Sequence, residues 1–178
     1  MSHNFDELRQ IAERMCNDNP SVMHHWHPET LRKMLLMTLC GMVLSSLLCG
    51  ANEIRGIANK CLDVRGGDSD NGTPVEIWPC HGGANQEWRF TPQGEIRGIA
   101  NKCLDVKGGV SNDGTPVILW PCNGGANQQW RYVHGELPGV GDKCLDVKGG
   151  VSDDGTLIIL WRCHGSANQK WRMRHFVQ

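Results

Sequence analysis

The sequence predicts an all-β domain made of three copies of one unit, preceded by a segment of different character. Two observations carry this prediction. The tetrapeptide Cys-Leu-Asp-Val occurs three times, and each time a second cysteine and then a Gln-x-Trp tripeptide follow at nearly constant intervals. The leading cysteines, Cys61, Cys103 and Cys144, are 42 and 41 residues apart. A fixed period of this length indicates one structural unit repeated around or along an axis.

Each repeat has the pattern of short strands separated by turns. In the first copy the expected strands are 54–57, 61–64, 75–78 and 87–90, and the other copies follow the same pattern. Between the second and third strands, a Gly-Gly pair and an Asn-Gly or Asp-Gly step supply the positive backbone angles of tight turns. Four strands in each copy predict about twelve strands in the whole domain.

The charge balance argues against nucleic acid as a partner. The chain has 18 Lys and Arg against 19 Asp and Glu, and the repeats share this near neutrality. A nucleic-acid-binding domain would need a basic face. Six of the seven tryptophans hold fixed positions in the repeats, so they supply most of the large aromatic surface.

Six of the nine cysteines form one pair in each repeat, and the pairs are open to two interpretations, disulfides or metal ligands. Zinc sites usually draw paired ligands from short spacings such as Cys-x2-Cys, which this sequence lacks. Three equivalent disulfides are therefore favoured, and disulfides imply an oxidising compartment. The expected bridges are Cys61–Cys80, Cys103–Cys122 and Cys144–Cys163.

Neither a metal nor a cofactor is expected. The acidic residues of the loops show no recurring spacing of oxygen ligands, so turn formation explains them better than calcium binding. These residues are Asp68, Asp70, Asp113, Asp153 and Asp154. Residues 24–27 are His-His-Trp-His; adjacent histidines do not share a helix face, so an exposed linker explains them better than a metal site.

Residues 1–51 differ in character from the repeats. Residues 1–33 form a leader of unclear role, with apolar residues at helical spacing near its start. Residues 34–51 contain a charge-free apolar run after Arg32 and Lys33, which is shorter than a membrane span and ends in small residues. This arrangement is typical of a secretory signal cleaved after Ala51. The alternatives are an uncleaved anchor with the repeats outside the cell, or a buried helix.

Alternation along the strands predicts which side chains face the core. Leu62 and Val64 point to one face, while Cys61 and Asp63 point to the other. The disulfide joins the outer faces of two strands, so Asp63 and Trp78 are expected on one patch. An indole matches the apolar face of a pyranose, and a carboxylate accepts hydrogen bonds from hydroxyls, so this pair indicates sugar recognition.

The two sets of tryptophans receive different predictions. Those before the second cysteine of each pair are assigned to sugar sites, with capping of the domain edge as the alternative. Those of the Gln-x-Trp tripeptides are assigned to the core. The first set is Trp78, Trp120 and Trp161, and the second is Trp88, Trp130 and Trp171.

The pattern Cys-Leu-Asp-Val, Trp-Pro-Cys and Asn-Gln-x-Trp resembles the ricin-type β-trefoil lectins and the related xylan- and galactose-binding modules of bacterial glycosidases. The resemblance covers residues 54–178 and leaves out 1–53. It implies a β-trefoil, a six-stranded barrel capped by three hairpins, in a domain spanning 52–178. The repeats would be 54–95, 96–136 and 137–178, each with up to one shallow sugar pocket.

The resemblance also implies which residues line the pockets: the strand aspartate, the outer tryptophan, a polar residue after the second cysteine, and the Asn-Gln pair. The implied residues are Asp63, Glu76, Trp78, His81, Asn85 and Gln86 in the first pocket, Asp105, Trp120, Asn123, Asn127 and Gln128 in the second, and Asp146, Trp161, His164, Asn168 and Gln169 in the third.

One position departs from the family pattern. Ricin-like pockets often have a glutamine two residues before the aromatic residue, where this chain has Glu76, Ile118 and Ile159. A polar group at that position bonds a hydroxyl that isoleucine cannot. The sequence therefore predicts that the first pocket binds most tightly, followed by the third and then the second.

The leading functional hypothesis is a non-catalytic lectin that binds galactose- or xylose-type residues of extracellular glycans or polysaccharides. One alternative is a structural or protein-binding trefoil with vestigial sites. Another is the targeting module of a glycoside hydrolase or toxin whose active part is a separate chain. A glycosidase itself needs two carboxylates flanking one bond. The recurring acids here are related by repetition, so they lie too far apart to form such a pair.

Overall fold

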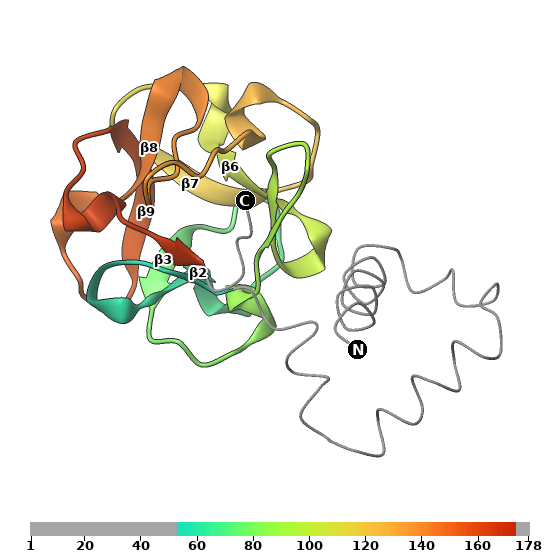
Figure 1. Ribbon diagram of the computed structural model, residues 1–178. Helices are drawn as coiled ribbons and strands as arrows, with labels where there is room; N and C mark the ends of the chain where they lie inside the picture. The colour runs from blue at the N-terminus through green and yellow to red at the C-terminus, as the bar shows by residue number, and fades with distance from the viewer. Residues whose placement is uncertain (1–52, 174–178) are drawn as a thin grey trace, which may run out of the picture. The chain divides into compact units, whose positions relative to one another are not determined.

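The computed structural model describes residues 53–173, which form ten short strands and a series of 3-10 turns (Figure 1). Repeat 1 contains β1 (Ile54–Arg55), β2 (Cys61–Val64), β3 (Val75–Trp78) and β4 (Arg89–Phe90). Repeat 2 contains β5 (Ile96–Arg97), β6 (Cys103–Val106) and β7 (Thr115–Trp120). Repeat 3 contains β8 (Lys143–Val147), β9 (Thr156–Arg162) and β10 (Arg172–Met173).

Three antiparallel hairpins, β2–β3, β6–β7 and β8–β9, form the centre of the fold. Their registers are equivalent: Leu62 pairs with Ile77 in the first, and the matching leucine pairs follow in the others. Strand β9 also pairs with both β3 and β7, so the third repeat joins the first two. All pairings are antiparallel, in the order β10-β1-β2-β3-β9-β7-β6-β5-β4, with β8 on β9.

The prediction of four strands per repeat is wrong at the junction between repeats 2 and 3. There the expected strands shrink to the isolated bridges Val133–Glu136 and Pro138–Cys144. Pro138 occupies the position that Arg55 and Arg97 hold in the other repeats. Proline has no backbone N–H to donate to a ladder, so the pairing cannot extend into a regular strand.

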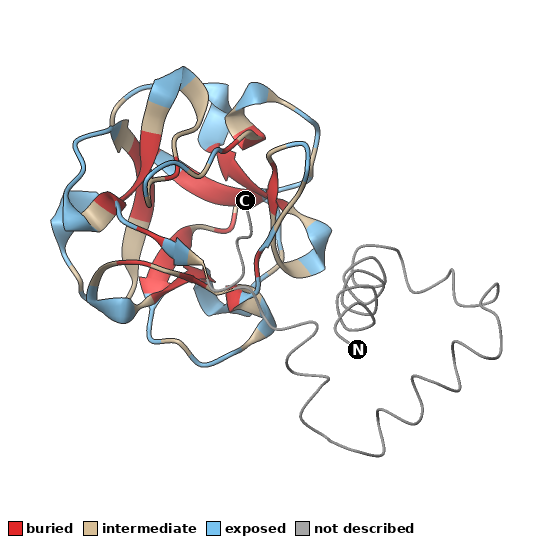
Figure 2. Cartoon of the chain, viewed as in Figure 1, coloured by how far each residue is buried: buried red, intermediate tan, exposed pale blue. Residues whose placement is uncertain are grey.

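The core contains the aliphatic side chains that alternation assigns to it, together with one tryptophan from each repeat. Figure 2 shows that buried residues follow the strands, while the turns between them are exposed. The indole nitrogens of Trp88, Trp130 and Trp171 donate to the carbonyl oxygens of the Cys-Leu-Asp-Val leucines at 2.9, 3.0 and 3.0 Å. Each Gln-x-Trp tryptophan thus satisfies its polar atom inside the core. Gly98 lies against the Trp88 ring, where a Cβ atom would come within 2.7 Å of the ring.

The three expected disulfides are present. Cys61–Cys80, Cys103–Cys122 and Cys144–Cys163 have Cα–Cα distances of 5.1, 5.1 and 5.0 Å. Each ties the Cys-Leu-Asp-Val strand to the loop that follows the next strand. Closing a loop of this length stabilises a fold by about 3 kcal/mol in the chain-entropy account.

Lysines join each repeat to a loop of another repeat. The Lys60 and Lys143 ammonium groups pair with Asp154 and Asp113 at 2.5 and 2.7 Å, and the Lys102 ammonium group donates to the Ser69 carbonyl oxygen. Two of the loop acids therefore hold the repeats together.

Residues 53–173 contain no helix long and apolar enough to cross a bilayer. The predicted leader, 1–33, and the predicted signal or anchor, 34–51, lie outside the described residues.

Candidate functional site

Each Cys-Leu-Asp-Val strand places an aspartate on the outer side of its hairpin, next to a tryptophan of the neighbouring strand. Asp63 pairs with Glu76 in the β2–β3 register, and Cys61 pairs with Trp78. Because side chains alternate along strands, Asp63 and Trp78 share a face, as the sequence predicts. The β6–β7 and β8–β9 registers place Asp105 and Asp146 in the same way.

Two amides converge on one oxygen of each aspartate. In repeat 1, Asn85 Nδ2 and Gln86 Nε2 donate to Asp63 Oδ2 at 2.9 and 2.7 Å. The corresponding distances are 2.8 and 2.7 Å at Asp105, and 2.9 and 2.7 Å at Asp146. We call each trio of aspartate, asparagine and glutamine the carboxylate cluster of its repeat.

The other oxygen of each aspartate has no protein donor in the described part of the chain, although Asp63, Asp105 and Asp146 are only 2, 3 and 2% exposed. No donor among residues 53–173 bonds Oδ1 of Asp63, Asp105 or Asp146. Within the same residues, Glu136 Oε1 is the single buried side-chain oxygen or nitrogen that lacks a partner, so these Oδ1 atoms are not sealed from water. Each cluster therefore has one acceptor oxygen that no donor of the described residues occupies.

The glutamines of the three clusters have no exposed surface. Gln86, Gln128 and Gln169 are 0% exposed. Besides bonding the aspartate, the Gln86 amide donates to the Pro79 carbonyl oxygen, and its own carbonyl accepts from the His81 N–H at 2.8 Å. The glutamines predicted as pocket residues thus support the aspartates and connect them to the disulfide loops.

The residue after the second cysteine differs among the repeats. His81 Nε2 lies 3.5 Å from Asp63 Oδ2, and His164 Nε2 lies 3.4 Å from Asp146 Oδ2. Asn123 holds this position in repeat 2, where its Oδ1 accepts a hydrogen bond from the Gly125 N–H at 2.8 Å. All three residues are exposed at the rim of their clusters.

The outer tryptophans are partly exposed and pack against glycines of a different repeat. Trp78 and Trp120 are 40% and 39% exposed, and Trp161 is half-buried. A Cβ atom on Gly155 would lie 3.7 Å from the Trp78 ring, and Gly72 stands in the same relation to Trp120 at 3.8 Å. One part of each indole therefore rests on a hairpin loop, while the rest faces solvent.

Glu76 is 4% exposed, and Arg65 holds its carboxylate through a hydrogen-bonded ion pair. In the other repeats Ile118 and Ile159 stand opposite Pro74 and Pro116, whereas Glu76 stands opposite Leu157. Glu76 therefore lies at the boundary between repeats 1 and 3.

Sequence reasoning missed Arg65. The sequence does contain a signal for this pair, since repeat 1 differs from the other two repeats at both positions. Those repeats have lysine at the position of Arg65 and isoleucine at the position of Glu76.

Burial raises the pKa of Asp63, Asp105 and Asp146 above the ordinary aspartate value. The hydrogen bonds from the cluster glutamine and asparagine act in the opposite direction and only partly offset it. His81 and His164 also favour the ionised form of Asp63 and Asp146. Asp105 has no such neighbour, since Asn123 replaces the histidine.

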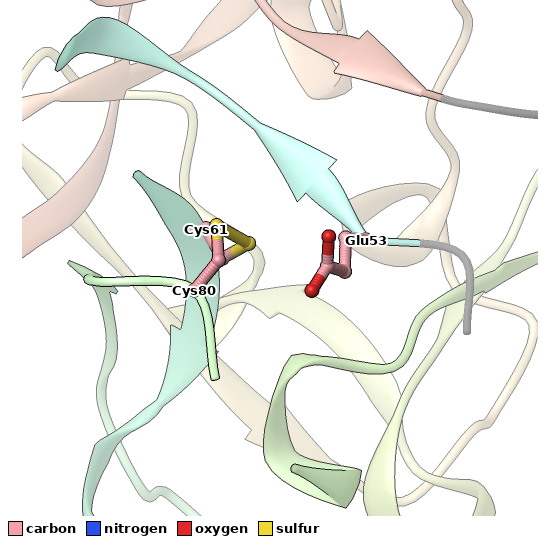
Figure 3. Close-up of side chains that lie close together, drawn as sticks. All are labelled: Glu53, Cys61 and Cys80. Atoms are coloured by element: carbon pink, nitrogen blue, oxygen red, sulfur yellow. A yellow bond between two sulfur atoms is a disulfide. The ribbon is translucent and has the colours of Figure 1, made fainter. Parts of the chain in front are cut away.

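Two of the disulfides each have a glutamate beside them. Figure 3 shows the Glu53 carboxyl group near Cys61 and Cys80, and one carboxylate oxygen and both sulfurs lie within 4.8 Å of one another. Glu95 has the same relation to the second disulfide. The sulfurs are bonded to each other, and the Glu53 carboxylate accepts from the Arg55 guanidinium. The disulfide-bonded cluster therefore offers a metal ion no thiolate ligand.

Comparison with known proteins agrees with this architecture. A 42-residue segment is 38% identical to the ribosome-inactivating protein PMRIPt of Polygonatum multiflorum, covering 24% of this chain and 7% of that protein. Among solved structures, the designed threefold-symmetric protein ThreeFoil matches with a TM-score of 0.65 and 32% identity, over 70% of this chain and 98% of that one.

A non-toxic homologue of type II ribosome-inactivating proteins from Momordica charantia (bitter gourd), solved with α-methyl-D-galactoside, matches with a TM-score of 0.61 and 25% identity. The match covers 68% of this chain and 46% of that one. The sequence profile of the ricin-type beta-trefoil lectin domain matches residues 50–171, most of the chain. The chain belongs to the ricin-type β-trefoil lectin domain family.

Proposed function

We propose that this chain is a carbohydrate-binding lectin with one shallow sugar site in each repeat. The observation that carries the proposal is the Oδ1 of each cluster aspartate, which has no donor among the described residues and lies on the same face as a partly exposed indole. A pyranose has an apolar C–H face and a rim of hydroxyls, and these two groups complement such a surface.

The exposure of each residue determines the role that it can have in the sugar site. The outer tryptophan stacks on the sugar ring, and the aspartate accepts hydrogen bonds from sugar hydroxyls. The glutamine never touches the sugar, because it is fully buried, and it acts by fixing the aspartate. Asn85 and its counterparts are only half-buried, so they can reach both the aspartate and a ligand.

Galactose-type residues are the preferred ligand class, with xylose-type residues as the second choice. The bitter-gourd homologue was solved with a methyl-galactoside, which supports galactose. Three weak sites on one rigid body would hold a polysaccharide or a dense glycan surface better than a monosaccharide.

Binding without catalysis fits the arrangement of the acids. The three aspartates belong to separate hairpins, and Glu76, the acid that stands opposite Asp63, is held by Arg65, whereas glycoside hydrolysis needs two carboxylates flanking one bond. The matched segment is 7% of PMRIPt, so a role as the targeting part of a larger assembly remains the second proposal.

A structural trefoil with vestigial sites is the competing function. The buried glutamine bonds show that Asp63 and Gln86 serve the fold as well, so their presence alone does not separate the two functions. The partly exposed outer tryptophans support the sugar sites, since indole surface left in contact with solvent contributes nothing to core packing.

The repeats are proposed to work outside the cytosol, where three disulfides persist. Secretion by a signal at 34–51, or anchoring through it, remains an expectation from the sequence.

The test is a glycan array probed with the oxidised chain and with a Trp78→Ala, Trp120→Ala, Trp161→Ala variant. We expect the chain to bind galactose- or xylose-terminated glycans and the triple variant to lose that binding. Val133→Ser provides the matched control, because Val133 is 41% exposed and lies outside the three clusters. A folded triple variant with an unchanged array profile would show that the sites do not use these tryptophans, and absence of glycan binding by the chain itself would favour the structural function.

A further inference from the structure

Asparagine followed by glycine occurs twice in this chain, at Asn71-Gly72 and Asn123-Gly124. Such steps are prone to deamidation, because the glycine nitrogen can attack the asparagine side-chain carbonyl without hindrance from a side chain. Both asparagines are exposed, so exposure does not distinguish them. The hydrogen bonds around the two glycine nitrogens do.

At Asn71 the attacking nitrogen is engaged. Gly72 N–H donates to the Leu119 carbonyl oxygen at 2.8 Å, a bond that joins the hairpin loop of repeat 1 to repeat 2. The equivalent glycines of the other repeats, Gly114 and Gly155, make the same bond at 2.8 and 3.0 Å. Attack by the Gly72 nitrogen therefore requires this contact between repeats to open first.

At Asn123 the attacking nitrogen is free. Gly124 N–H has no acceptor among residues 53–173, and no atom lies within 4 Å of where a Gly124 Cβ would be. The next amide, Gly125 N–H, donates to Asn123 Oδ1 at 2.8 Å. This bond holds the Asn123 carbonyl over the backbone and stabilises the negative charge that develops on its oxygen during attack.

We propose that Asn123 is a spontaneous deamidation site of this protein and that Asn71 is protected from the same reaction. The Gly124 nitrogen loses its proton to solvent and bonds to Asn123 Cγ. The Cγ–Nδ2 bond then breaks and ammonia leaves, which closes a succinimide ring. Water, the only co-reactant, opens the ring at Cγ to give aspartate, or at the main-chain carbonyl to give isoaspartate.

The product changes the second sugar site, a consequence that rests on the proposed function. Asn123 occupies the position of His81 and His164, whose rings lie 3.5 and 3.4 Å from the cluster aspartates. Its backbone N–H also donates to Gln128 Oε1 at 2.8 Å, and Gln128 holds Asp105.

An aspartate at 123 adds a second negative charge beside Asp105, and an isoaspartate lengthens the backbone where Gln128 is bonded. Either product weakens the second site, while the first and third sites, which have histidine, are untouched. The protein therefore carries one sugar site that is lost with age and two that are not.

The chemical test is incubation of the oxidised, folded full chain at mildly alkaline pH in ¹⁸O-labelled water, followed by peptide mapping. The two asparagines fall in different tryptic peptides, 66–89 and 108–131. We expect Asn123 to incorporate label about tenfold faster than Asn71. This rate ratio corresponds to the free energy needed to break the Gly72 hydrogen bond, if its net contribution lies near the upper end of the usual range. Incubation of the reduced, denatured chain should bring the two rates together. Equal rates in the folded chain, or faster reaction at Asn71, would overturn the proposal.

The functional test measures retention on galactose-bearing agarose during the same incubation. We expect retention of the chain to fall towards that of Asn123→Asp as label enters position 123. Asn123→His, the residue of the other two repeats, is the matched control, and its retention should not drift from its own starting value. Deamidation with no change in retention would overturn the loss of the second site. Absence of retention from the outset would instead count against the proposed lectin function and leave the mapping result standing.

Discussion

Gln86 connects Asp63 to the disulfide loop of its repeat. The Gln86 amide donates to Asp63 Oδ2 at 2.7 Å, and the Gln86 carbonyl accepts from the His81 N–H at 2.8 Å. The same relation recurs between Gln128 and Asp105 and between Gln169 and Asp146. A glutamine with no exposed surface thus fixes the orientation of the Asp63 carboxylate, whose other oxygen has no donor within residues 53–173.

The first prediction concerns this buried amide. Gln86→Ala removes the three hydrogen bonds of this side chain, to Asp63, to the Pro79 carbonyl and from the His81 N–H, so we expect a loss of about 3 kcal/mol in the free energy of unfolding. Glu87→Ala, at the exposed neighbouring position, is the control and should change it little. Urea unfolding of the oxidised variants measures both, and equal effects would show that the Gln86 bonds contribute little.

The second prediction concerns Arg65 and Glu76. Arg65→Ala leaves the buried Glu76 carboxylate without its partner. We expect this variant to lower the free energy of unfolding by about 2 kcal/mol, which is less than for a fully buried ion pair because Arg65 is half-exposed. Lys107→Ala, the same position in repeat 2, should cost much less.

The same pair bears on the predicted order of the pockets. Since Arg65 already holds the Glu76 carboxylate, we expect Glu76→Ile, which copies the other repeats, to change retention on a galactose matrix little. A large loss of retention with unchanged stability would mean that Glu76 bonds the sugar, as the sequence alone suggests.

The third prediction concerns backbone strain. Ala58 and Ala100 have φ angles of 52° and 55°, where repeat 3 has Gly141 at 67°. Replacing an L-residue in this conformation by glycine removes strain and raises the free energy of unfolding by roughly 1–2 kcal/mol. The greater freedom of glycine in the unfolded chain lowers the free energy of unfolding by about 0.4–1 kcal/mol.

We therefore expect Ala58→Gly to raise the free energy of unfolding by a net amount of about 0.5 kcal/mol. Ala84→Gly, at a position without positive φ, should lower it. If Ala58→Gly is as destabilising as Ala84→Gly, the left-handed turn carries no strain.

The fourth prediction concerns pH. Burial raises the pKa of all three cluster aspartates, so the folded chain binds their protons more tightly than the unfolded chain does. Their contribution to stability is then fully present below the ordinary aspartate pKa and is lost as pH rises through the folded pKa. These aspartates therefore do not drive acid unfolding.

Sugar binding follows the opposite course, because an ionised carboxylate is the better acceptor. On acidification we expect retention to fall at a pH above the ordinary aspartate pKa, while the fold persists. The second site should be lost first, since Asp105 lacks the histidine that favours ionisation of Asp63 and Asp146. Retention that disappears only together with the near-UV circular dichroism signal would contradict this.

The sequence predicts well those features that repetition and alternation decide. The hairpin registers, the three disulfides, the buried Trp88 and the shared face of Asp63 and Trp78 all follow from period and parity. The burial of Gln86 does not, because it depends on which loop folds over the strand. The sequence does contain a signal for the loss of regular strand at Pro138, because proline stands there in place of the arginine of the other repeats.

Contacts between repeats are harder to predict than contacts within them. The pairing of Lys60 with Asp154 and of Lys143 with Asp113 joins residues distant in sequence, so no local pattern indicates it. Arg65 and Glu76 belong to one repeat, but their pairing depends on packing at the boundary with repeat 3.

The most direct test of the sugar sites is a calorimetric titration of the oxidised chain with methyl-galactoside, beside the folded triple variant Trp78→Ala, Trp120→Ala, Trp161→Ala. The sites are shallow, so we expect each to bind near millimolar Kd, or about 4 kcal/mol. The chain should bind up to three equivalents, each single tryptophan variant should bind one fewer, and the triple variant should give no binding heat. Binding by the triple variant equal to that of the chain, or no binding by the chain itself, would contradict the assignment.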